Sequence, residues 1–153
     1  MRLSLRTELP CSYEAAVHWV KRPALLFHIA WPLVRFLPEP ETAVGAQWEE
    51  GTHWYRLRLF TVLPFGRQAV RISFDESADR LRLRDNGYSR LIPKWDHLIT
   101  IERAGDSTHY RDDLELDAGI LAPVIWVFAR GFYAHRQRRW RQLARDDFRA
   151  LDP

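Results

Sequence analysis

One stretch, from Trp95 to about Arg145, constrains the fold more than any other part of the chain. Two segments with alternating apolar and polar residues, WDHLITIER and HYRDDLELDAG, flank turn residues between Ala104 and Ser107, as in a β-hairpin. The segment ILAPVIWVFARGFYAHRQRRWRQLARDDF then follows and has by far the longest helical pattern. This order predicts a sheet whose inner face packs against the C-terminal helix.

The final helix carries an inward stripe that is apolar except for one arginine. The residues at the 3.6-residue period are Ile125, Phe128, Ala129, Phe132, Arg136, Trp140 and Leu143. The second half of the segment holds five arginines between positions 136 and 145, where cations complement the helix dipole. We expect a solvated basic face there, with contact to phosphate or to an acidic membrane as the alternative.

The predicted hairpin turns polar groups towards the same side as its apolar residues. The inward-facing set is Trp95, His97, Ile99, Ile101, Tyr110, Asp112, Leu114 and Leu116. A two- or four-residue loop pairs odd positions of the first strand with even positions of the second, so both halves of the set lie inside. His97 and Asp112 would then be opposed or diagonal neighbours, close enough for a hydrogen bond.

The N-terminal part predicts one strand and two short helices. Residues 2–9 alternate between apolar and polar. Ser12 fits the N-cap of a helix that stops before Pro23, and Pro23 fits the first turn of a second helix that ends near Trp31. Residues 33–51 show no firm period and predict a long connection, with a short strand near its start as an option.

Residues 53–92 alternate as antiparallel strands do, with turns expected at residues 64–66 and at Asn86-Gly87. The predicted inward-facing apolar residues are Tyr55, Leu57, Leu59, Val70, Ile72, Phe74, Leu81 and Leu83. The first turn would bring Leu59 and Leu57 against Ile72 and Phe74.

Composition fits a single domain over residues 1–153, because 46% hydrophobic residues can fill a core of this size. A net charge of +3 is too small to argue for nucleic-acid binding. With Cys11 as the one cysteine, no intrachain disulfide can form. The start of the sequence has no apolar signal-peptide core, and no run reaches the ~20 residues of a membrane span. We expect a cytoplasmic protein.

Sequence motifs for metal, nucleotide or covalent chemistry are missing. The six histidines do not show the HxxxH spacing of a helical zinc site, and one cysteine cannot form a thiolate cluster. GxSxG, GxGxxG and P-loop patterns do not occur either. We therefore expect neither a metal nor a cofactor.

The whole pattern resembles the helix-grip fold of the START/SRPBCC superfamily, which includes polyketide cyclases and lipid-transfer domains. The resemblance covers essentially the whole chain and is carried by LPCSYEAAVHWVKRPALL, LPFGRQAVRISF, KWDHLITIE, YRDDLELDAG and FYAHRQRRW. It implies an α+β fold with a curved antiparallel sheet of six to seven strands wrapped around the long C-terminal helix, and two short helices after the first strand. It also implies a cavity between sheet and helix.

In such a cavity we expect a hydrophobic small molecule: a lipid, an isoprenoid or an aromatic polyketide-like compound. The polar end of the ligand would be oriented by His97, Asp112 and Tyr110. The expected ligand-binding residues are Tyr55, Leu57, Leu59, Ile72, Phe74, Leu83, Trp95, His97, Ile99, Tyr110, Asp112, Leu114, Ile125, Phe128 and Phe132.

Two other functions stay open at this point. The first is a cyclase or dehydratase in which His97 acts as general acid or base and Asp112 orients it. The second is a module that binds a protein or RNA through the arginine-rich end of the helix. The oligomeric state and the ligand are not defined by the sequence.

Overall fold

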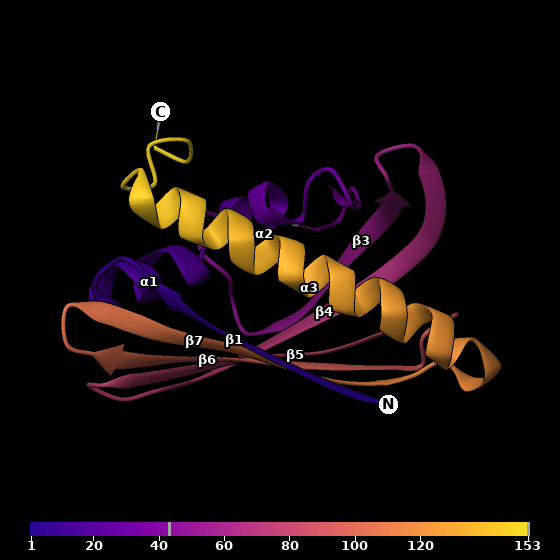
Figure 1. Ribbon diagram of the computed structural model, residues 1–153. Coiled ribbons are helices and arrows are strands. Elements are labelled where there is room, and N and C mark those ends of the chain that lie inside the picture. Colours follow the sequence, from indigo (N-terminus) through magenta and orange to yellow (C-terminus); the bar gives the residue numbers. More distant parts are fainter. Residues whose placement is uncertain (43, 153) are drawn as a thin grey trace.

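The computed structural model describes residues 1–42 and 44–152, which form one seven-stranded antiparallel sheet, three α-helices and a short 3-10 helix (Figure 1). In chain order the elements are β1 (Arg2–Leu9), α1 (Tyr13–Val20), α2 (Pro23–Ala30), β2 (Val34–Pro38), β3 (Gly51–Leu59), β4 (Leu63–Glu76), β5 (Arg80–Ser89), β6 (Lys94–Ala104), β7 (Ser107–Asp117), η1 (Gly119–Leu121) and α3 (Ala122–Arg145).

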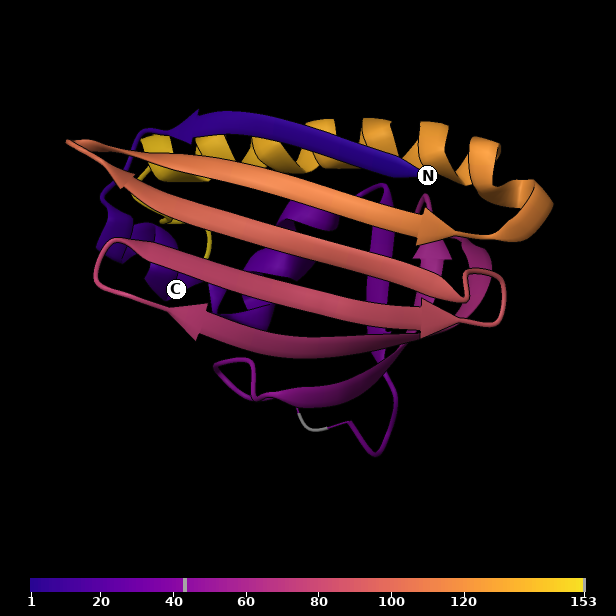
Figure 2. The ribbon, with the colours of Figure 1, turned by 90° about the horizontal axis from the view of Figure 1, so that it is seen from below.

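The sheet has the strand order β1-β7-β6-β5-β4-β3-β2 and is strongly curved. Helix α3 crosses its inner face, as Figure 1 shows, and the view from below in Figure 2 shows the opposite face of the strands with α3 behind them. The α+β helix-grip architecture, with two short helices after the first strand, is confirmed. The optional strand after α2 is also present, as β2.

The short helices begin and end where their local chemistry predicts. The Ser12 side chain accepts a hydrogen bond from the backbone N–H of Ala15 at 3.1 Å and so caps α1. Pro23 occupies the start of α2, where its missing N–H costs nothing. Together α1 and α2 bury Val17, Leu25 and Ile29 against the sheet and α3.

The β6–β7 hairpin has a two-residue turn at Gly105-Asp106, and Gly105 takes the positive φ of 64° that such a turn requires. In this register Ile99 pairs with Asp112, and His97 pairs with Leu114. His97 and Asp112 are therefore diagonal neighbours on the inner face of the sheet.

The turn predicted at residues 64–66 is wrong, because the chain reverses four residues earlier, over residues 60–62. Phe60 and Thr61 adopt left-handed φ values of 50° and 66° there. Leu57 pairs with Gly66 and Leu59 with Leu63, instead of with Phe74 and Ile72. The register shifts beside Gly66, whose φ of 108° fits a β-bulge, so the proline–glycine signal marks a bulge rather than a turn.

The turn predicted at Asn86-Gly87 is also wrong. Strand β5 continues through both residues to Ser89, and Gly87 pairs with Trp95 of β6. A Cβ atom at Gly87 would lie 2.2 Å from the backbone oxygen of Ala69, so a close approach of two strands explains the glycine. As a consequence Asp85 stays within the strand, directly opposite His97.

Candidate functional site

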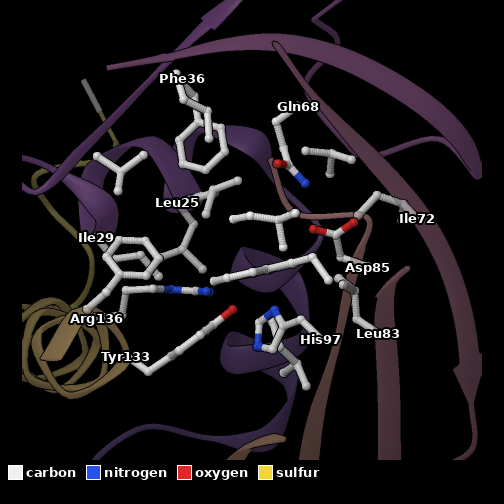
Figure 3. Close-up of a pocket in the computed structure, with 18 of the residues that line it drawn as sticks. Leu25, Ile29, Phe36, Gln68, Ile72, Leu83, Asp85, His97, Tyr133 and Arg136 are labelled. Carbon is white, nitrogen blue, oxygen red and sulfur yellow. The ribbon is translucent and has the colours of Figure 1, made fainter. Parts of the chain in front are cut away.

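A cavity of about 130 Å³ lies between the inner face of the sheet and α3, with α2 and β2 contributing to its wall (Figure 3). Most of its lining is aliphatic or aromatic. Gln68, Asp85, His97, Tyr133 and Arg136 supply polar or ionisable groups, and Figure 3 shows them around the same space. An apolar cavity with a few polar groups has the usual character of a small-molecule site.

Many of the residues expected from the sequence line this cavity. They are Leu57, Leu59, Ile72, Leu83, Trp95, His97, Ile99, Ile125, Phe128 and Phe132. They come from β3, β4, β5, β6 and α3, which shows that the alternation along each strand identified the inner face correctly.

Five expected residues lie outside the cavity wall: Tyr55, Phe74, Tyr110, Asp112 and Leu114. The Tyr55 ring is enclosed by Phe27, Phe36 and Trp48, at centroid distances of 5.9, 5.8 and 6.3 Å. Trp140 packs on Tyr110 at 5.4 Å. Bulky side chains from the helices, from β2 and from the segment before β3 therefore fill the space in front of Tyr55 and Tyr110. The five expected residues therefore do not line the cavity, although the sequence predicted that they face inward.

Several lining residues were not expected from the sequence. The apolar ones are Val20, Leu25, Leu26, Ile29, Val34, Phe36, Trp48, Phe65, Val70, Ile92 and Trp140, and the polar ones are Gln68, Asp85, Tyr133 and Arg136. For Arg136 a signal did exist, since it follows Phe132 by four residues in the inward stripe of the helix.

Asp112 is the centre of a hydrogen-bonded cluster behind the cavity. Its Oδ1 lies 2.8 Å from His97 Nε2 and accepts a hydrogen bond of 2.8 Å from the Tyr110 hydroxyl. Its Oδ2 accepts one of 2.9 Å from Gln137 Nε2, which also donates to the Leu5 backbone oxygen at 3.0 Å. All four side chains of this Asp112 cluster are buried, so the carboxylate is satisfied from three sides.

Hydrogen bonding and burial set the charges in the Asp112 cluster. Burial alone would raise the pKa of Asp112, but the hydrogen bond from His97 and the positive charge of Arg136 outweigh it and keep the pKa below its usual value. Burial lowers the pKa of His97, more than the Asp112 carboxylate raises it. A neutral imidazole that donates Nε2–H to Asp112 leaves Nδ1 as an acceptor, and His97 also lines the cavity.

Arg136 is buried in the wall of the cavity, with 5% of its surface exposed. Its guanidinium lies over the rings of Tyr133 and Phe132 on the preceding turn of α3, at 5.0 and 5.7 Å from the centroids. Within residues 1–42 and 44–152 it makes no hydrogen bond and has no carboxylate within 4.0 Å, and its Nε is enclosed without a partner. The expectation of a solvated face is therefore wrong for Arg136.

Asp85 and Gln68 lie beside each other, on the side of the cavity opposite Arg136 (Figure 3). Oδ1 of Asp85 accepts a hydrogen bond of 2.9 Å from the backbone N–H of Arg71. Burial raises the pKa of Asp85 to about 7, although Arg71 and Arg136 act in the opposite direction. At neutral pH this carboxyl therefore exchanges between its neutral and charged forms.

The remaining arginines of α3 differ among themselves. Arg139 contacts His28 on α2 at 3.1 Å, and Arg141 donates to Thr7 on β1 at 2.7 Å. Arg138 and Arg145 are exposed. The basic end of the helix thus holds neighbouring elements together as well as facing solvent.

Across residues 1–42 and 44–152 we find no cluster of His, Cys, Asp and Glu side chains arranged to hold a metal ion. None of the helices in that part of the chain has both the length and the apolar character to cross a membrane.

No known family model and no curated protein matches this sequence. Solved structures do match. A Thermus thermophilus protein is 8% identical with a TM-score of 0.66, covering 96% of this chain and 99% of its own. A START superfamily protein from Mycobacterium smegmatis is 12% identical with a TM-score of 0.60, covering 95% and 97%. A Chromobacterium violaceum protein is 14% identical with a TM-score of 0.61, covering 94% and 96%. At these identities the likeness shows a shared START-type fold and nothing about the ligand.

Proposed function

We propose that this chain, which has a START-type helix-grip fold, binds a hydrophobic small molecule in the cavity between the sheet and α3. The observation that carries the proposal is the cavity itself, since close packing normally leaves few voids of this size in a domain. The polar groups in its wall would orient one end of the ligand. We place this activity in the cytoplasm, which agrees with Cys11 as the one cysteine.

The size of the cavity limits what it holds without rearrangement. About 130 Å³ is close to the ~150 Å³ of an engineered protein cavity that binds benzene. One ring, or a short branched chain, therefore fits as it stands. A whole lipid, isoprenoid or polyketide-like molecule would need the wall to open, for example by movement of α2.

The apolar surface area that a one-ring ligand buries in the cavity limits the affinity that we expect. Enclosing roughly 150–250 Å² of apolar surface contributes about 4–6 kcal/mol at about 25 cal/mol/Å². As an upper limit on affinity, this corresponds to dissociation constants no lower than tens of micromolar, with about 1 mM at the smaller area. Calorimetry and ligand-observed NMR both cover this range.

The test is a titration of 3-phenylpropanamide, a neutral one-ring probe, into three proteins. Leu57 lines the cavity from β3, so Leu57→Trp should fill it and weaken binding at least about tenfold. Val127 is 66% exposed on α3, so Val127→Trp serves as the matched control and should bind as the wild type does. Equal binding to Leu57→Trp, or no binding to the wild type, would reject the proposal. Native mass spectrometry of freshly purified protein would reveal a ligand carried from the cell.

A second candidate function, cyclase- or dehydratase-like proton transfer, is favoured by one observation: His97 both contacts Asp112 and lines the cavity. Its neutral imidazole could accept a proton from a ligand while Asp112 stabilises the resulting cation. If a bound β-hydroxy carbonyl compound loses water, His97→Gln should slow that loss by about 10²–10⁴-fold. An unchanged rate in His97→Gln would exclude this function.

A further inference from the structure

We propose that the ligand is a hydrophobic monocarboxylic acid whose carboxylate binds the guanidinium of Arg136 inside the cavity. This inference rests on the proposed function and names the chemical class of its ligand. It starts from one feature of the wall: a buried cation whose donors point into the cavity and meet no acceptor (Figure 3).

Three arginines of the sheet have the carboxylate partners that Arg136 of α3 does not have. Arg67 binds Glu39 through two hydrogen bonds of 2.6 Å, and Arg84 binds Asp96 through bonds of 2.8 and 2.6 Å. Arg103 binds Glu14 and Asp79. Each of the three is more exposed than Arg136, yet each has a carboxylate. A buried guanidinium without a hydrogen-bonded anion leaves its donors unsatisfied, and a bound anion would satisfy them.

Asp112 does not supply the missing partner. Its two oxygens already accept from His97, Tyr110 and Gln137, and neither oxygen comes within 4.0 Å of the Arg136 nitrogens. Its charge still acts at longer range and helps to keep Arg136 protonated. The wall therefore holds a permanent cation whose hydrogen-bond donors remain available.

Charge balance favours an anion with one negative charge. Among the described residues, Arg136 is the one arginine or lysine in the cavity wall, and Asp85 is the one acidic residue there. Since burial raises the pKa of Asp85 to about 7, a substantial share of it is uncharged at and below neutral pH and does not compete for Arg136. A phosphate monoester would bring up to two charges opposite a single cation, whereas a carboxylate brings one.

The apolar wall of the cavity and the planar guanidinium together define the chemical class of the ligand. Phe132, Ile29 and Trp95 line the same cavity as Arg136 and would enclose an apolar group. A planar guanidinium binds a carboxylate through two parallel hydrogen bonds, so the acid group would be oriented as well as neutralised. A short branched-chain acid meets both demands within about 130 Å³, and an arylalkanoic acid meets them once the wall opens slightly.

The experiment compares two probes of one shape, 3-phenylpropanoate and 3-phenylpropanamide, by calorimetry at pH 6.5. Wild type should bind the acid at least about tenfold more tightly than the amide. Arg136→Met should lose this preference while keeping the affinity for the amide within about threefold. Arg138, exposed two residues further along α3, gives the matched control, and Arg138→Met should retain the preference.

The outcomes separate this inference from the proposed function. Equal binding of acid and amide by wild type leaves the cavity function intact and overturns the acid. Binding of neither probe overturns both. Tighter binding of 2-phenylethyl phosphate than of 3-phenylpropanoate would overturn the single-charge argument. If Arg136→Met does not fold, Arg136→Lys keeps the charge without the planar fork and should show a reduced but measurable preference; a preference equal to that of wild type would contradict the guanidinium role.

Discussion

Asp112 and Arg136 are two buried ions of opposite charge on facing elements, β7 and α3. They differ in how many hydrogen bonds the surrounding residues provide. Asp112 receives hydrogen bonds from three side chains and lies behind the cavity. Arg136 lines the cavity, and its described contacts are to aromatic ring faces. A buried ion that is satisfied belongs to the scaffold, and one that is left unsatisfied beside a cavity marks the place for a ligand.

The polar residues of the inner face therefore fall into two groups, one that supports the structure and one that faces the cavity. The Asp112 cluster connects β6, β7, α3 and the backbone of β1, so it fixes the position of the helix on the sheet. Arg136, Asp85 and Gln68 connect fewer elements and face the cavity. We therefore expect changes in the first group to act on stability and changes in the second group to act on binding.

The largest effect should come from Asp112→Ala. It leaves His97, Tyr110 and Gln137 without their acceptor and removes a negative charge that acts on Arg136 at longer range. We expect the free energy of unfolding to fall by about 3–5 kcal/mol in urea denaturation. Asp113→Ala is the neighbouring control on the opposite face and should cost less than about 1 kcal/mol. Equal losses in the two variants would mean that the Asp112 cluster is not the scaffold element described here.

Asp85→Asn should produce a smaller effect that depends on pH. The folded-state pKa of about 7 lies above the usual value for aspartate, so the folded chain holds its proton more tightly than the unfolded chain. The stability that this proton provides is present at low pH and is lost as pH rises through about 7. The variant should therefore be more stable than wild type by about 3–4 kcal/mol at pH 8, and the difference should nearly vanish by about pH 4. A constant difference at both pH values would contradict the shift.

Arg136→Met should have the smallest effect on stability. It removes no hydrogen bond to a described residue, and the relief of a desolvated charge offsets the lost contacts with Tyr133 and Phe132. We expect the free energy of unfolding without ligand to change by less than about 1 kcal/mol. A loss as large as that of Asp112→Ala would place Arg136 in the scaffold and remove the contrast between the two ions.

The fold could be predicted because its signals are local. The alternation in β6 and β7, the turn at Gly105-Asp106 and the helical period of α3 are each set within about ten residues of sequence. Together they place His97 and Asp112 on the same face before any coordinates are known. The diagonal contact between them at 2.8 Å follows from that register.

The cavity wall was less predictable because it depends on which side chains fill the space between distant elements. Asp85 was missed because Asn86-Gly87 has the signature of a turn, whereas its glycine serves the close approach to Ala69. Arg136 was counted with the cations of the basic helix end, although its position in the inward stripe pointed the other way. Tyr110 and Asp112 face inward as predicted, but Trp140 from α3 packs on Tyr110.

The most direct test of the account is a crystal structure of the complex with 3-phenylpropanoate. We predict the phenyl ring among Phe132, Ile29 and Trp95, with both carboxylate oxygens within hydrogen-bonding distance of the Arg136 guanidinium, at about 2.7–2.9 Å. The Asp112 cluster should keep its hydrogen bonds unchanged. A ligand bound outside the cavity, or one whose carboxylate points away from Arg136, would contradict the account.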